Sequence, residues 1–265
     1  MGIAVISIAK FLAVALALGM AAVVSASPMD EESKQIFTNL TRLHAASVVR
    51  VSFVMTSRFQ GQEQSQEAST TGVIVDARGL VLVSRMVVSP TVPGMEKLTN
   101  EQRAGFKFET GSFRVHFPGV DRPAEAEALT SDDDQGVAWL HITTPDPGQL
   151  KPLDLAVIDD AAPGQAYYVI ERLDKKFGEA PILSWGVVVG AISVPQVAFM
   201  VTGAAGLALS AEGKVIGYVA MDLGDSGDEP ASMSSTSRQI MTPARKLKAA
   251  TERAASLLEE PPDQS

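Results

Sequence analysis

Because the sequence contains no cysteine, we look first for a serine or threonine hydroxyl that an imidazole could activate as a nucleophile. Nucleophilic catalysis by a hydroxyl needs a general base, most often an imidazole, within hydrogen-bond reach. Only three histidines are present, at His44, His116 and His141. The most conspicuous serine is Ser226, in the segment GDSGD at residues 224–228. Serine, glycine and acidic residues surround it on both sides, so we expect a solvated loop there.

Each histidine is expected to have a structural role. His44 ends a helical pattern over residues 30–44, where a capping or surface role is expected. His116 alternates with apolar neighbours in a strand pattern, so it should face away from an apolar core. His141 follows two apolar residues at alternate positions of its strand and should be partly buried. None of the three is predicted to be a catalytic base.

The sequence predicts no cofactor and no metal site. It lacks a Walker loop, an HExxH motif and cysteine-based ligand spacing. The acidic run at residues 132–134 could supply half of a calcium site, but a solvated turn is the expected reading. The net charge of -9, from 22 basic and 31 acidic residues, argues against a nucleic-acid partner.

The N-terminal residues have the pattern of a secretory signal. Lys10 precedes 14 uncharged, mostly apolar residues at 11–24, and small residues follow up to Ala26. We expect a signal peptide over residues 1–26, a periplasmic or secreted protein, and no membrane association after cleavage. The open alternative is an uncleaved anchor that includes residues 1–9. Export without any cysteine is more typical of a bacterial periplasm than of disulfide-stapled secretion.

From Ala46 onward the sequence consists of short β-branched and aromatic runs separated by turn residues. Such runs indicate an all-β sandwich or barrel instead of alternating strands and helices. A helical pattern returns at residues 242–260, with Thr242 as the expected N-cap and Pro243 at the first helical position.

Two segments of the chain repeat one pattern. Residues 72–83 read GVIVDARGLVLV and residues 206–217 read GLALSAEGKVIG, and in each the two glycines are seven positions apart. The second glycine, Gly79 or Gly213, suits the left-handed position of a bulged hairpin. The chain is therefore predicted to contain two similar β halves.

These segments carry a family resemblance. Residues 70–88 resemble the first-barrel hairpin of trypsin-like serine proteases of the HtrA (Deg) type, which leads to the catalytic histidine. Residues 122–142 resemble the segment that holds the catalytic aspartate. Residues 184–192 look like the strand before the nucleophile loop, and residues 202–220 are similar to that loop and its following hairpin. The similarity continues in consistent order from about residue 47 to residue 248.

The resemblance implies an all-β, trypsin-like double barrel of two six-stranded barrels, to which the helical patterns add an N-terminal and a C-terminal helix. The expected segments are a signal peptide (1–26), an N-terminal helical segment (27–46), a first barrel (47–150), a second barrel (151–241), and a C-terminal helix and tail (242–265).

At the catalytic positions this sequence departs from the family. The resemblance places Met86 at the histidine, Gly136 at the aspartate and Ala205 at the serine. The N–H groups of Gly203 and Ala205 could still form a vestigial oxyanion loop, although Leu207 and Ala208 replace the next glycine and proline of the family loop. Losing such a triad costs roughly 10⁶-fold in turnover, so ordinary proteolysis is not expected.

We therefore predict a catalytically inactive homologue, a pseudoprotease, that binds an extended peptide or another envelope protein. The resemblance places the candidate peptide-binding residues on a strand edge of the second barrel, at Phe199, Met200, Val201 and Thr202. These side chains could instead only complete the core.

Two other functions stay open at this point. One is an active serine endopeptidase with a relocated site, using Ser226, Ser210 or Thr202 and a relocated base. The other is a structural component of the envelope in which the groove has no role. A histidine or carboxylate close to a hydroxyl near Ala205 would distinguish the first from the pseudoprotease.

Overall fold

The structure is a computed structural model and describes residues 31–59, 62–90, 106–194, 196–221 and 239–259. It divides into two compact units, Met1–Gln35 and Ile36–Ser265, and both barrels described here belong to the second. The predicted signal peptide and Ser226 lie outside the described residues.

The first half of the chain forms a closed antiparallel barrel with the strand order β1-β2-β3-β6-β5-β4. Its elements are β1 (Val48–Phe59), β2 (Gln62–Asp76), β3 (Leu80–Ser84), the 3-10 helix η1 (Arg85–Val87), β4 (Phe106–His116), β5 (Ala124–Asp132) and β6 (Val137–Ile142). Helix α2 (Glu31–His44) precedes the barrel.

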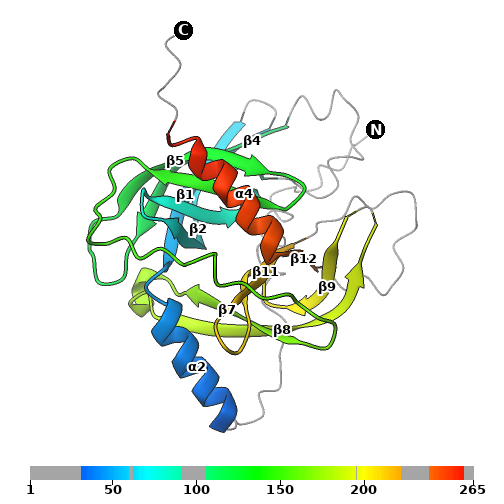
Figure 1. Cartoon of the computed structure of the whole chain (residues 1–265). Helices are drawn as coiled ribbons and strands as arrows, with labels where there is room; N and C mark the ends of the chain where they lie inside the picture. The colour runs from blue at the N-terminus through cyan, green and yellow to red at the C-terminus, as the bar shows by residue number, and fades with distance from the viewer. Residues whose placement is uncertain (1–30, 60–61, 91–105, 195, 222–238, 260–265) are drawn as a thin grey trace, which may run out of the picture. The chain divides into compact units, whose positions relative to one another are not determined.

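The second half closes in the same way, with the order β10-β11-β12-β9-β8-β7. Its elements are β7 (Ala166–Arg172), the 3-10 helix η3 (Lys175–Phe177), β8 (Pro181–Ile192), β9 (Ala198–Gly203), β10 (Gly206–Leu209), β11 (Val215–Met221) and β12 (Gln239–Pro243), followed by helix α4 (Ala244–Ser256). Figure 1 shows these elements in chain order by colour. The prediction of two six-stranded barrels with a helix near each end is confirmed.

The burial of β3 on both faces explains why its sequence is a continuous apolar run. Val81 and Val83 point into the core of the first barrel, whereas Leu80 and Leu82 belong to a second cluster on the outside of that barrel. A strand covered on both faces needs apolar residues at every position. The outer cluster also contains residues of the second barrel and of α4, so a shared apolar core joins the two barrels.

The repeated pattern marks one bulged hairpin in each barrel. Strands β2 and β3 pair antiparallel in the first barrel, and β10 and β11 pair antiparallel in the second, each with a register shift beside the turn. Gly79 has φ +92° and Gly213 has φ +88°, the left-handed region that the spacing predicted.

Helix α4 begins one residue later than predicted. Thr242 is not its N-cap, because β12 continues to Pro243 and the helix starts at Ala244. The Thr242 hydroxyl is buried and donates instead to the carbonyl oxygen of Gln135 in the first barrel, at 3.5 Å. The sequence pattern could not reveal this competing acceptor, which lies 107 positions away.

Helix α4 connects the two barrels. It contacts β11 and β12 of the second barrel and β5 of the first, as Figure 1 shows for the red helix. Trp139 of β6, buried at 1% exposure, donates from Nε1 to the hydroxyl of Thr251 on this helix, at 3.2 Å. Among the described residues, no helix has the length and apolar composition needed to cross a membrane.

Candidate functional site

Met86 lies in η1, immediately after β3. The Ser84 hydroxyl accepts a long hydrogen bond of 3.4 Å from the Met86 amide and so caps this turn. The Arg85 amide donates to the carbonyl oxygen of Gly136 at 3.0 Å, which brings two of the three predicted triad positions side by side. A thioether takes up no proton at ordinary pH, so Met86 cannot serve as a general base.

Gly136 occupies the turn between β5 and β6, with φ +67°. A Cβ atom added there would lie 2.6 Å from the Cβ of Ala220 in β11, far closer than two carbon atoms can approach. Any side chain at this position, including that of an aspartate, would therefore overlap Ala220. Sequence reasoning identified Gly136 but not Ala220, since the contact joins the two barrels across 84 positions.

Ala205 lies at the exposed tip of the loop between β9 and β10. Gly203 begins this loop with φ +116°. A Cβ at Gly203 would lie 2.4 Å from the Cα of Gly186 and 2.5 Å from the carbonyl oxygen of Trp185, so only glycine fits. The Gly203 position that resembles the family loop is therefore required by the backbone itself.

Tyr167 fixes this loop from inside the second barrel. Its hydroxyl donates to the carbonyl oxygen of Ala204 at 2.7 Å and lies 3.3 Å from that of Thr202. The residue is fully buried, and burial raises the pKa of its phenol, which keeps it protonated as a donor. In a planar trans peptide the N–H points opposite to the preceding C=O, so the N–H groups of Gly203 and Ala205 point away from Tyr167.

The candidate peptide-binding strand β9 is paired on both sides. Residues Phe199 to Val201 pair with β8 on one side and with β12 on the other. The expectation of a free strand edge is wrong for this part of β9. Phe199 packs against the core of the second barrel and Val201 is 3% exposed, whereas Met200, at 37%, and Thr202 are exposed.

The hydroxyl of Ser210 has no imidazole partner. It donates to a carboxylate oxygen of Glu212 at 2.8 Å and accepts from the amide of Lys214 at 3.3 Å, so it closes the β10–β11 turn. His44 places Nε2 2.8 Å from the carbonyl oxygen of Gly213 in the same turn. These contacts hold the end of α2 against the second barrel.

Asp132 also has a structural role. Its carboxylate accepts from the amide and from Nε2 of Gln135, at 3.1 and 2.8 Å, and pairs with Arg253 of α4 at 3.4 Å. Among the described residues, no group of three or more histidine, cysteine or acidic side chains is placed to hold a metal ion.

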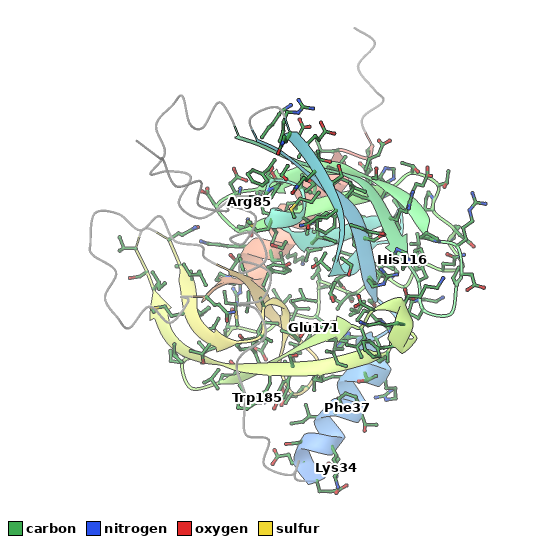
Figure 2. All side chains as sticks on the ribbon, turned by 180° about the vertical axis from the view of Figure 1, so that it is seen from behind. Lys34, Phe37, Arg85, His116, Glu171 and Trp185 are labelled. Atoms are coloured by element: carbon green, nitrogen blue, oxygen red, sulfur yellow. The ribbon has the colours of Figure 1, made fainter. Side chains whose placement is uncertain are left out.

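One histidine does approach a hydroxyl, far from the β9–β10 loop in sequence. His116, labelled in Figure 2, places Nε2 2.9 Å from the hydroxyl of Ser52, and its Nδ1 is 3.9 Å from a carboxylate oxygen of Glu179. Ser52, His116 and Glu179 thus lie in the order of a nucleophile, a general base and an orienting acid. However, Ser52 is only 3% exposed, so a substrate carbonyl cannot reach it. Sequence reasoning missed the pair because 64 positions separate its members.

The comparisons with known proteins agree with this fold. No protein-family model matches the sequence, and no curated protein matches it either. Among solved structures, 255 chains match. One is the structure described as "HtrA-type protease AlgWS227A with decapeptide", which is 16% identical, has a TM-score of 0.53, and aligns over 84% of this chain and 67% of its own. The chain thus has a trypsin-like fold of the HtrA type.

Proposed function

We propose that this chain is a catalytically inactive trypsin-like homologue that binds an extended peptide or another protein through the surface around its β9–β10 loop. The observation that carries this proposal is the closed position at Gly136, where Ala220 leaves no room for an acid. Ala205 supplies no hydroxyl, and Met86 supplies no base. A relocated hydrolytic site is not favoured, because the one hydroxyl–imidazole pair described above is buried.

The binding part of the proposal rests on the outward N–H group of Ala205, since Gly203 is paired with Gly186 of β8. The Ala205 N–H can donate to a main-chain carbonyl without any triad residue. Since β9 is paired on both sides, Met200 and Thr202 would contribute side-chain contacts and not strand pairing. Phe199 and Val201 would support that surface from the core. The structural neighbour is described with a decapeptide, which makes a peptide of similar length the first ligand to try.

The proposal includes export. Residues 1–26 would act as the signal, and the partner would then be a protein or peptide of the periplasm or the cell exterior. The residue types at 11–26 support it.

The inactivity is tested with a fluorophosphonate probe and a casein assay on the purified chain, with trypsin as the active control. We expect neither labelling nor hydrolysis. Labelling that disappears in Ser226→Ala would show that a relocated nucleophile exists and would reject the proposal.

Binding is tested on an immobilised library of decapeptides, comparing the wild type with Ala205→Arg. Ala162→Arg, at another exposed position before β7, is the matched control. We expect Ala205→Arg to lose the peptides that the wild type retains, with unchanged thermal stability. Retention of the same peptides by Ala205→Arg would place the binding surface elsewhere.

A further inference from the structure

Residues 173–180 join β7 to β8, and we call them the β7–β8 connection. This connection contacts the first barrel through polar side chains. Arg50 of β1 donates from Nε and Nη2 to one carboxylate oxygen of Glu179, at 3.1 and 2.9 Å, and both residues are 8% exposed. The same oxygen lies 3.9 Å from Nδ1 of His116, whose Nε2 is 2.9 Å from the Ser52 hydroxyl. We call Arg50, Ser52, His116 and Glu179 the polar joint.

The backbone of the connection holds Glu179 in place. Gly178 and Glu179 have φ +68° and +54°, and a left-handed conformation is costly for a residue with a side chain. Arg172 donates from Nη1 to the Glu179 carbonyl oxygen at 3.0 Å and from Nε to that of Val48 at 2.9 Å. The backbone conformation is therefore unfavourable at Glu179, the residue whose side chain reaches Arg50 of the first barrel.

The charges of the joint balance only while His116 is neutral. Arg50 and Glu179 cancel each other, and the paired Glu179 oxygen already accepts two N–H groups. A proton on His116 would add a second cation to a largely buried site, in which the side chains of His116 and Glu179 are 16% and 9% exposed.

The groups that face this imidazole come from three elements. They are Arg50 on β1, Glu67 on β2, and Lys175 and Glu179 on the connection. Burial, and then the charge of Arg50, lower the pKa of His116 below its ordinary value of 6.5, and the two glutamates oppose the shift only in part.

We propose that the polar joint is an acid-sensitive latch, in which protonation of His116 releases the β7–β8 connection from the first barrel. The released state exposes the imidazolium to water and relaxes the left-handed backbone at Glu179. This device is independent of the peptide-binding function, because none of its side chains belongs to the β9–β10 loop.

The test is amide hydrogen exchange of residues 173–180 in the full chain between pH 7.5 and 5.5, expressed as protection factors. We expect the opening constant to rise by up to about tenfold per pH unit below pH 6.5. His116→Gln should abolish this response, because an amide can bond to Ser52 but cannot take up a proton. His141→Gln, in which the changed histidine lies outside the joint, should retain the response.

Protection that stays constant over this pH range would overturn the proposal, and so would a response that persists in His116→Gln. If His116→Gln fails to fold, the NMR titration of His116 in the wild type decides the matter. A midpoint below 6.5 that coincides with the loss of protection supports the latch. A midpoint at or above 6.5 overturns it, since the closed joint would then favour the proton.

Discussion

The hydroxyl of Tyr167 lies 2.7 Å from the carbonyl oxygen of Ala204 and donates to it from the interior of the second barrel. The geometry of the exposed loop is thus set by a core residue that needs no catalytic partner. A nucleophile, base or acid could be lost from the surface without changing this hydrogen bond. The hydrogen bond therefore fixes the shape of the loop independently of any catalytic residue.

Tyr167→Phe removes this donor and keeps the ring. We expect the free energy of unfolding to fall by about 1–3 kcal/mol, because two carbonyl oxygens lose a buried hydrogen-bond donor. Urea unfolding measures the loss. Unchanged stability would show that the Tyr167 hydroxyl does not hold the loop.

Gly136→Ala tests whether the second barrel closes the predicted acid position. The added methyl group meets Ala220 at a position with φ +67°, so both overlap and backbone strain should destabilise the fold. The matched control is Gly119→Ala, at φ +73° with nothing within 4 Å of the added Cβ. We expect the first variant to lose about 1–3 kcal/mol more than the control in urea unfolding. Equal losses would mean that strain alone acts and that a side chain fits beside Ala220.

The sequence predicts features that depend on neighbouring residues better than features that depend on contacts between residues far apart in the chain. The two hairpins were predictable, because the seven-residue spacing from Gly72 to Gly79 is a local property of the chain. The pairing of β9 on both sides was not, since its second partner β12 is defined only when the barrel closes. The sequence of a single strand does not show whether its backbone groups are paired on one side or on both.

The candidate site shows the same division. The family resemblance placed Met86, Gly136 and Ala205 at the triad positions from residue order along the chain, and this assignment stays a prediction. The reason that Gly136 is closed lies in Ala220, and the reason that the loop keeps its shape lies in Tyr167. No sequence motif marks Ala220 or Tyr167, so their roles are visible only in the folded structure.

Stability should depend on pH through His44. Burial lowers the pKa of its imidazole, and the hydrogen bond to the Gly213 carbonyl opposes this shift only in part. The unfolded chain therefore binds the proton more readily, so the stabilisation is complete above pH 6.5 and is lost as the pH falls toward the lower folded pKa. Carboxylates with lowered pKa, such as Asp76, stay ionised in this range.

The measurement is urea unfolding of the wild type and His44→Gln at pH 7.5, 6.5 and 5.5. Glutamine can still donate to the Gly213 carbonyl but cannot titrate. We expect the wild type to lose stability on acidification and the variant to lose less, with the remainder due to His116. A steeper loss in His44→Gln would contradict this assignment.

Glu179→Gln should be strongly destabilising, because it leaves the guanidinium of Arg50 buried without a compensating charge. Removing one partner of such a pair costs about 3–5 kcal/mol, whereas replacing both charges is often neutral. The double variant Arg50→Met/Glu179→Gln should therefore recover much of the stability lost in Glu179→Gln alone. Glu63→Gln is the matched control, because its partner Arg58 is exposed and the pair is screened by water. Urea unfolding of the four proteins would contradict the assignment if Glu179→Gln behaved like Glu63→Gln, since the joint would then contribute no more than a surface ion pair.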